Sequence, residues 1–248
     1  YYAVLRVITP EGKIQRVVGN GRVAAPVNGP GLESSIPAVV SISVDSNDDL
    51  WLAGSYGVWK VIIPKAPGEV TKIKQYISYP IVAVTIDKKM VGAVSADVMY
   101  FSWYNSLNTG QPVSAAQSYI YKMTRAQLES QSAPLSLPDL KANYIYAGNG
   151  NIMVPSDSIP YGPRPLTTTA LGYVWDMMVS PNGDLFFSTI QDGNGRLFSQ
   201  HTLQVIHKDS SGTPQIYLLS RQEIPWISDL KYINRGVDQY VIASGYFL

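Results

Sequence analysis

Three oxygen-bearing side chains share one equivalent position when the apolar first strands of a repeated pattern are aligned. They are Ser41, Asp176 and Asp229, and Ala83 takes the same place in a fourth strand. If these strands converge on a central axis, the two carboxylates repel each other unless they bind a cation or share a proton. Carboxylate and carbonyl oxygens suit Ca²⁺ or Mg²⁺. Two interpretations stay open: a metal site at these three residues in an axial channel, or aspartates that accept backbone N–H bonds and order their own loops.

Groups for nucleophilic or acid–base catalysis are scarce. The chain has no cysteine, which excludes thiolate nucleophiles, disulfides and zinc–thiolate sites, and it has two histidines. His207 takes the basic position of an expected third strand, and His201 lies in the segment 198–202, which we expect to be a polar loop or a strand edge. No Gly-x-Ser-x-Gly motif is present. We assign no catalytic residue, and this scarcity favours a protein that is not an enzyme.

Two loop sequences resemble ligand-binding motifs without completing them. The Gly-Asn-Gly segments at 19–21 and 148–150 lack the Lys-Ser/Thr ending and the following helix of a phosphate-binding loop. We expect them to be turns with positive φ at the exits of outer strands. Residues 45–49 (DSNDD) resemble part of a calcium loop but lack its Gly and its Glu, so we expect a solvated hairpin tip.

Aromatic residues near two long insertions are the candidates for binding. The insertions, residues 105–117 and 151–169, exceed the ~4–6 residues of ordinary connections, and loops on a rigid scaffold commonly carry binding sites. We predict Trp103, Tyr104 and Tyr161 as anchors, because Trp and Tyr offer large contact areas at low entropy cost. Packing between neighbouring sheets also uses aromatic residues and is the alternative.

The composition limits the class of protein. The 248 residues are 46% hydrophobic and 15% charged, with a formal net charge of +1. These values exclude a disordered chain and give no strong field toward nucleic acid or an anionic membrane. The sequence contains no run of 18 apolar residues, so it predicts no membrane-spanning helix. The N-terminus has neither Met nor a basic stretch, so we expect a mature or trimmed chain that forms a single domain, 1–248, alone or within a larger protein.

A repeated unit must position these residues. An apolar strand, a tight turn and a second strand recur, with the alternation and the Asn/Asp/Gly turns typical of hairpins. The repeats are residues 39–53, 174–188, 227–244 and, less clearly, 81–87 followed by 98–103. A third strand with a basic residue among apolar ones follows at 58–61 and 120–123, and less clearly at 205–208.

The last repeat lacks this third strand, and the N-terminus supplies a match. Residues 3–10 (AVLRVITP) are similar to residues 57–64 (GVWKVIIP). Pairing the two termini in one sheet would close a ring of radial sheets with ladder hydrogen bonds. We therefore expect residues 4–8 to pair with 240–244 in an all-β propeller of four blades with long loops. Six blades, or an open sandwich, are the alternatives.

One short helix is expected in this otherwise all-β chain. It spans residues 124–130, where Thr124 and Gln127 are spaced to form a capping box.

The segment 6–31 contains three motifs in order: Thr-Pro-Glu-Gly-Lys-Ile, Val-Val-Gly-Asn-Gly and Asn-Gly-Pro-Gly. Residues 39–61 follow with an apolar strand, a hairpin and a basic third strand. The chain thereby resembles NHL-repeat β-propellers, including the teneurin-like ones, over most of its length except about 105–116 and 131–141. The resemblance implies a propeller fold. Related gluconolactonase-type propellers hold a divalent metal at the channel mouth through Glu and Asn ligands besides Asp, and no such Glu is identified here.

Two functions follow as expectations. The first is a non-enzymatic binding or assembly module that presents Tyr/Ser/Asn-rich loops to a protein or glycan partner, at an extracellular or virion surface. The alternative is a metal-dependent hydrolase or lactonase of the gluconolactonase type, with Ca²⁺ in the axial channel.

Overall fold

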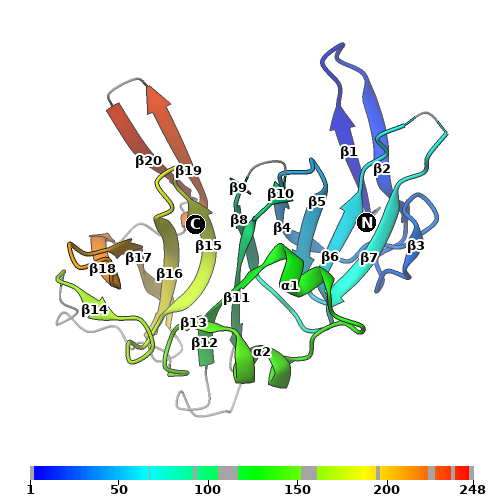
Figure 1. The fold of residues 1–248 in the computed structure, drawn as a ribbon. Coiled ribbons are helices and arrows are strands. Elements are labelled where there is room, and N and C mark those ends of the chain that lie inside the picture. The colour runs from blue at the N-terminus through cyan, green and yellow to red at the C-terminus, as the bar shows by residue number, and fades with distance from the viewer. Residues whose placement is uncertain are drawn as a thin grey trace. The chain divides into compact units, whose positions relative to one another are not determined.

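The computed structural model describes residues 3–66, 68–91, 94–105, 117–151, 161–193, 196–222, 227–235 and 238–245. Strands make up 55% of the structure and helices 6%, in several antiparallel sheets, which confirms the all-β prediction (Figure 1). The chain divides into two compact units. Unit 1 comprises residues 1–98 and 123–141, and unit 2 comprises 99–122 and 142–248.

Three sheets contain the predicted repeats. Sheet A has the order β3 (Gly29–Pro30), β7 (Lys72–Ile77), β6 (Gly57–Ile62), β5 (Leu50–Gly54), β4 (Val39–Val44). Sheet B has the order β13 (Ile145–Ala147), β12 (Gln117–Thr124), β11 (Val98–Asn105), β8 (Ala83–Asp87). Sheet C has the order β14 (Arg164–Pro165), β18 (Pro214–Gln222), β17 (Arg196–Lys208), β16 (Leu185–Gly193), β15 (Tyr173–Val179). In each sheet the first strand therefore pairs with the expected second strand, and the expected third strand follows on the far side of the second.

The remaining strands form two-stranded sheets. The N-terminal hairpin is β1 (Ala3–Ile8) with β2 (Ile14–Gly21), the C-terminal hairpin is β19 (Ile227–Arg235) with β20 (Asp238–Gly245), and β9 (Met90–Val91) pairs with β10 (Val94–Ser95). Among the strands that the structure describes, the two terminal hairpins are separate sheets and no closed ring is present. Closure by the termini and the number of blades therefore stay predictions.

A shared β-bulge supports the equivalence of the first strands. In β4, β15 and β19 the ladder with the following strand skips one residue near the strand start. The skipped residues are Val40, Trp175 and Ser228. Bulges are specific features rather than defects, and this one stands immediately before the position that the sequence aligned as Ser41, Asp176 and Asp229.

A second shared bulge relates the N-terminal hairpin to the third and fourth strands of the three sheets. Each fourth strand carries one extra residue opposite the third. These residues are Tyr76, Tyr146, Leu219 and, in the N-terminal hairpin, Val17. The bulge makes Leu5 the equivalent of Val58, so the sequence match, which aligned Val4 with Val58, was wrong by one residue. The extra residue sits on the partner strand, where the third-strand sequence gives no sign of it.

Both Gly-Asn-Gly segments stand at the ends of fourth strands with positive φ, as predicted, but residues 19–21 are the last three residues of β2, whereas 148–150 follow β13. Gly19 and Gly148 have φ values of +100° and +103°, which L side chains rarely adopt. The side-chain amides of Asn20 and Asn149 each donate to a carbonyl of the linker that leads to the next repeat, at 2.8 and 3.1 Å. The two linkers are thus held in the same way.

The cores lie between packed sheets. In unit 1 a buried cluster of Val18, Ile36, Leu52, Trp59, Val61 and Ile73 lies between the N-terminal hairpin and sheet A. In unit 2, Met178 and Leu230 are the buried residues between sheet C and the C-terminal hairpin. Each terminal hairpin therefore packs on a neighbouring sheet.

Two short helices connect β12 to β13. The helix α1 (Arg125–Glu129) has the predicted capping box between Thr124 and Gln127. The helix α2 (Leu137–Asn143) was not predicted, although Ser136 and Asp139 bond to each other's backbone N–H at its start. Neither of these described helices is long and apolar enough to cross a membrane.

Candidate functional site

The residue after the first-strand bulge bonds to the next repeat. Ser41 Oγ accepts the N–H of Val84 at 3.1 Å and donates to its carbonyl at 3.3 Å. Asp176 Oδ2 accepts the N–H of Leu230 at 2.8 Å. Val84 and Leu230 hold the same place in β8 and β19, one residue after the aligned position. The same contact therefore recurs in both units, and it links consecutive repeats.

This contact bears on the metal site predicted at Ser41, Asp176 and Asp229. Ser41 belongs to unit 1 and Asp176 to unit 2, and each uses an oxygen atom to bind a neighbouring first strand. Asp229 lies opposite Ser244 in the C-terminal hairpin, and its side chain is outside the described part of the structure. Among the described residues, no group of three or more His, Asp or Glu side chains could hold a metal ion.

The three predicted binding anchors differ in exposure. Trp103 is 3% exposed and stacks on Tyr119 with ring centroids 6.1 Å apart, so its indole is part of the core of unit 2. Tyr161 is 58% exposed. The side chain of Tyr104 and the insertion residues 106–116 and 152–160 lie outside the described residues.

A buried ion-pair cluster in unit 1 was not predicted. Lys60 Nζ lies 2.7 Å from Glu129 Oε1, 3.0 Å from Asp49 Oδ2 and 3.4 Å from Asp45 Oδ2. The expectation of a solvated hairpin tip at 45–49 was wrong for two of its three aspartates, because the Asp45 side chain is fully buried and that of Asp49 is 6% exposed, whereas Asp48 is exposed. Lys60 comes from β6 and Glu129 from α1. The sequence of the 45–49 turn does not indicate that either residue packs against it.

Arg125 extends the cluster. Its Nη1 lies 3.1 Å from Asp45 Oδ2 and 3.4 Å from Asp97 Oδ2. Asp97 Oδ2 also accepts the N–H and the hydroxyl of Ser46, both at 2.9 Å. The cluster therefore ties the β4–β5 turn, β6, α1 and the segment before β11 into one network.

The pKa values of Asp45 and Lys60 shift toward the charged forms. Burial raises the pKa of Asp45, but hydrogen bonds from Trp51 Nε1 and the Asp49 N–H, with the charge of Lys60, lower it below its usual value. Burial lowers the pKa of Lys60, but its contacts with Glu129 and Asp49 raise it overall. These shifts keep Asp45 and Lys60 charged at neutral pH, as in structural ion pairs.

The histidines have different surroundings. His201 lies in β17 and is 1% exposed, so the expectation of a polar loop or strand edge was wrong. His207 Nδ1 lies 2.8 Å from Asp184 Oδ1, with its side chain 55% exposed. Both belong to sheet C and neither lies beside a nucleophile among the contacts described.

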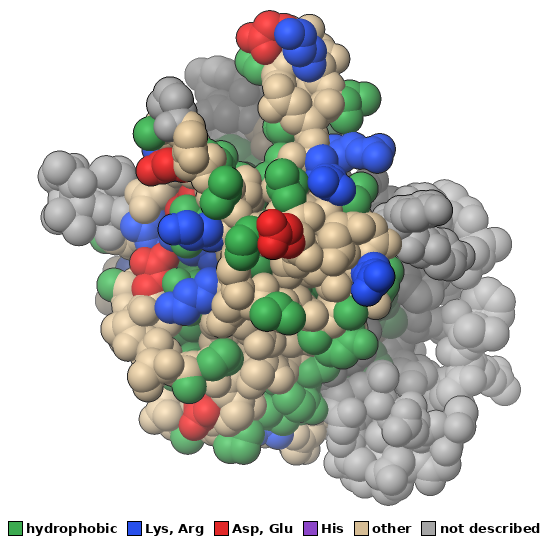
Figure 2. Space-filling model, turned by 90° about the vertical axis from the view of Figure 1, so that its right-hand side faces the viewer, with side chains coloured by type: hydrophobic (Ala, Val, Ile, Leu, Met, Phe, Trp, Pro, Cys, Tyr) green, Lys and Arg blue, Asp and Glu red, His purple; other side chains and the backbone are tan. Residues whose placement is uncertain are grey.

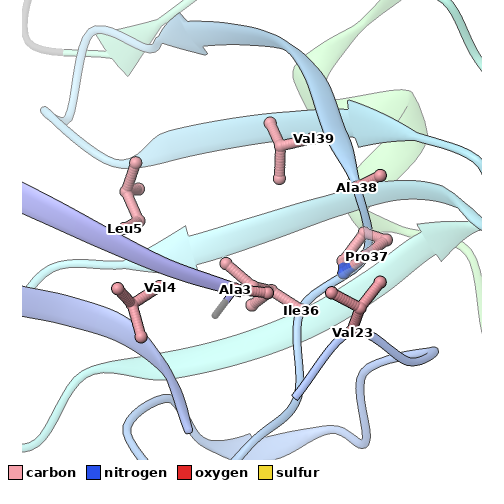
Figure 3. Close-up of a pocket in the computed structure, with 8 residues that line it drawn as sticks. All are labelled: Ala3, Val4, Leu5, Val23, Ile36, Pro37, Ala38 and Val39. Atoms are coloured by element: carbon pink, nitrogen blue, oxygen red, sulfur yellow. The ribbon is translucent and has the colours of Figure 1, made fainter. Parts of the chain in front are cut away.

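An apolar groove of about 400 Å³ opens beside β1 in unit 1. It is lined by Ala3, Val4 and Leu5, by Val23 and by residues 36–39, and Figure 3 shows these side chains around one opening. All eight residues are apolar. The lining therefore suits an apolar segment rather than a polar substrate.

Exposed apolar side chains continue from this groove along the N-terminal hairpin. Val7 is 44% exposed, Ile8 71% and Ile14 67%. Figure 2 shows this face of the molecule, with hydrophobic and basic side chains interspersed along the projecting hairpin. One edge of β1 pairs with β2, and β1 has no other strand partner among the described residues. An open strand edge beside an apolar groove is a site for adding a strand.

A scan against models of known protein families finds no match for this chain, and a search of curated proteins finds no relative.

Proposed function

We propose that the chain is a non-enzymatic binding or assembly module, built as a four-bladed β-propeller in which β20 pairs with β1. The three sheets provide three blades, and the two terminal hairpins together provide the inner and outer strand pairs of the fourth. The observation that carries the proposal is that the two terminal hairpins and the first strand of sheet A expose apolar residues at positions that are buried in the other repeats.

The first strand of sheet A supplies one such position. Ile42 is 49% exposed, whereas its equivalents Val84, Met177 and Leu230 are 3%, 4% and 5% exposed. Val84 lies on the strand that Ser41 bonds to, and Leu230 packs against sheet C. A closed ring would cover Ile42 with the C-terminal hairpin in the same way.

The terminal hairpins supply the others. Ile8 and Ile14 pair with each other, as do their equivalents Val61 and Ile73, which are 0% and 1% exposed. Ile242 of β20 is 47% exposed, and its equivalent Trp51 is fully buried. An isolated two-stranded hairpin is at best marginally stable, which gives both hairpins a reason to complete a sheet.

The bulges also predict a register for the proposed closure. Ala53 pairs with Val58 in sheet A, and Ser188 pairs with Leu203 in sheet C. The equivalents of these pairs are Ser244 and Leu5. We therefore expect Ser244 opposite Leu5, with Cβ atoms ~4.5–5.5 Å apart.

A thiol crosslinker tests this register, because the chain contains no other cysteine. The double variant Leu5→Cys/Ser244→Cys, treated with dibromobimane, is expected to give an internally crosslinked monomer. The control Lys13→Cys/Ser244→Cys, at the far end of the N-terminal hairpin, is expected to stay uncrosslinked. Deleting residues 1–18 is expected to lower the melting temperature by removing the outer strand pair. If the deletion leaves melting unchanged and no internal crosslink forms, closure by the termini is wrong.

The scaffold function rests on how the candidate site residues are used. Ser41 and Asp176 engage backbone groups of the next repeat. Asp45 and Asp49 engage Lys60, and Asp45 also engages Arg125. Tyr161 is the described anchor that faces solvent. We propose that it binds a protein or glycan partner at an extracellular or virion surface.

Partner binding is tested on glycan and protein arrays. Tyr161→Ala is expected to weaken the interaction at least tenfold with an unchanged melting temperature, and Tyr161→Phe is the matched control for ring stacking. Turnover of a lactone or ester panel that is lost on chelation and restored by Ca²⁺ would refute the non-enzymatic function and favour the hydrolase.

A further inference from the structure

The chain contains five Asn-Gly dipeptides, a pairing in which asparagine readily loses ammonia. Glycine has no side chain to shield its backbone nitrogen from the amide of the preceding asparagine. The structure describes four of these dipeptides, which begin at Asn20, Asn28, Asn149 and Asn182, and Asn194 lies outside the described residues. All four described asparagines are exposed, so exposure alone does not distinguish them.

Hydrogen bonds hold three of the four side chains in place. Asn20 Nδ2 donates to a linker carbonyl at 2.8 Å, and its Oδ1 accepts the N–H of Arg22 at 3.0 Å. Asn149 makes the same two kinds of bond, at 3.1 and 2.9 Å. Asn28 Oδ1 accepts the N–H of Gln75 at 2.8 Å. An amide held in this way reaches the next backbone nitrogen only after its bonds break.

Asn182 lies in the turn between β15 and β16, and its side-chain amide bonds to no residue in the described part of the chain. The N–H of Gly183 donates to the Ser180 carbonyl at 2.9 Å, and only this bond has to open to release the nitrogen. Turn tips open locally at a low cost in free energy. We infer that Asn182 is a modification site, where asparagine converts to aspartate and isoaspartate without an enzyme. This inference does not depend on ring closure.

The reaction consumes only water. Hydroxide removes the amide proton of Gly183, and the nitrogen then forms a bond to Cγ of Asn182. The Cγ–Nδ2 bond breaks, and Nδ2 leaves as ammonia with a proton from water, which regenerates the hydroxide. A second water molecule opens the cyclic imide at either carbonyl and gives aspartate or isoaspartate. Because hydroxide starts the reaction, its rate rises with pH.

The equivalent turn of sheet A provides a matched site. Asn47 holds the place of Asn182 and is also exposed, but the residue after it is Asp48. Asp48 has a φ of +58° where Gly183 has +86°, so the two turns share their backbone conformation. The side chain of Asp48 shields its nitrogen from Asn47. We therefore expect Asn47 to stay intact in the native protein and to become reactive in Asp48→Gly.

Conversion of Asn182 changes the turn in two ways. It adds a negative charge two residues before Asp184, whose Oδ1 lies 2.8 Å from His207 Nδ1. Isoaspartate also adds one backbone atom between Ser180 and Asp184, which close the turn with a bond of 2.9 Å from the Ser180 N–H to the Asp184 carbonyl. The modified turn therefore no longer fits the pairing of β15 with β16.

Peptide mapping of the incubated full-length chain by mass spectrometry tests the site. The peptide with Asn182 is expected to gain about 1 Da, faster at mildly alkaline than at neutral pH, and to become a substrate for an isoaspartyl methyltransferase. The peptides with Asn20, Asn28 and Asn149 are expected to react about tenfold more slowly or less, because their bonds must open first. A protein in which Asn182 stays intact while one of these three reacts overturns the inference.

Two controls separate the folded structure from the local sequence. In concentrated urea the four asparagines are expected to react at similar rates, and the native ranking persisting there would overturn the role assigned to the hydrogen bonds. In Asp48→Gly the peptide with Asn47 is expected to gain the same mass as the peptide with Asn182. An intact Asn47 in this variant would show that such turns protect their asparagine, which contradicts the inference.

Discussion

The Asp176 carboxylate accepts the backbone N–H of Leu230 at 2.8 Å, and Ser41 makes the equivalent contact to Val84 in the other unit. The two acceptors differ in charge, yet both stand one residue after the same bulge. A side chain that satisfies a neighbouring first strand explains an oxygen at this position without any ligand. The third member, Asp229, is opposite Ser244, and the same rule predicts that it binds the Ile42 N–H in a closed ring.

Loss of the Asp176 contact is expected to destabilise the fold. Asp176→Ala should lower the free energy of unfolding by about 2 kcal/mol, because it leaves the Leu230 N–H without its charged acceptor. Asp176→Asn keeps a carbonyl acceptor and should cost about half as much. Urea denaturation measures both, with Ser43→Ala as a control on β4. Should Asp176→Ala unfold at the wild-type urea concentration, the structural role is refuted.

A melting temperature that rises with Ca²⁺ would favour a metal site at Asp176. If Asp176 binds a divalent cation, CaCl₂ stabilises the native protein by mass action, and Asp176→Asn abolishes the effect. The hydrogen-bond role predicts no such difference between wild type and variant in calorimetry. The two calorimetric titrations therefore distinguish a metal ligand at Asp176 from a structural hydrogen bond between first strands.

Lys60 is expected to carry much of the stability of the buried cluster. Lys60→Met should cost about 3 kcal/mol at pH 7, because the buried carboxylate of Asp49 loses its nearest cation and that of Asp45 keeps Arg125 alone of its two. The matched control is Lys65→Met, whose ammonium is 52% exposed and 3.9 Å from Asp49, with an expected effect under about 0.5 kcal/mol. Equal effects of the two substitutions would contradict the role of Lys60.

The pH dependence has a defined sign. The lowered pKa of Asp45 gives stability that is present above its usual pKa of 3.8 and is lost as the pH falls through the lowered value. The raised pKa of Lys60 gives stability that is present below 10.5 and is lost as the pH rises through the raised value. Thermal unfolding should therefore show no loss from this pair between about pH 4 and 10. The cost of Lys60→Met should shrink as the pH falls through the lowered pKa of Asp45, because a protonated carboxyl group needs no cationic partner.

Asp48 is a site for stabilisation. It is the one non-glycine residue with positive φ in the described part of the chain, at +58°. The corresponding turn positions hold Gly12, Gly183 and Gly212, with φ of +77°, +86° and +80°. Asp48→Gly should raise the free energy of unfolding by about 0.5–1 kcal/mol, and Gly183→Ala should lower it by about 1 kcal/mol. A destabilised Asp48→Gly protein would mean that the turn needs the aspartate.

Ile42 distinguishes an open arrangement from a closed one. Ile42→Ala should cost about 2 kcal/mol or more if the C-terminal hairpin covers it, and under about 0.5 kcal/mol if it faces water. Val84→Ala is the buried reference and Val70→Ala the exposed one. Chemical denaturation of the three variants places Ile42 in one class or the other.

Trp103 and Tyr161 should separate folding from binding. Trp103→Ala is expected to cost about 3–5 kcal/mol, because it removes a buried indole from the core. Tyr161→Ala should change stability by under about 0.5 kcal/mol. Measuring the melting temperature and the partner affinity of each variant tests these two roles. If Trp103→Ala melts at the wild-type temperature, Trp103 is a surface anchor and not a core residue.

The sequence by itself determined the strands, their order within each repeat and the local turns. Alternating apolar residues, the Gly-Asn-Gly turns and the pair Thr124 and Gln127 act over a few residues, so their structural consequences are readable locally. The helix α2 was also readable, from Ser136 and Asp139, but its Pro and the short span concealed it.

Only the tertiary structure decided what the polar residues contact. Asp45 pairs with Lys60 and Arg125 from distant strands and helices, and Ser41 binds a backbone group 43 residues away. The one-residue register of β1 likewise depends on a bulge in its partner strand. Hydrogen bonds, ion pairs and bulges form between segments that the chain brings together only on folding, so no local pattern encodes them.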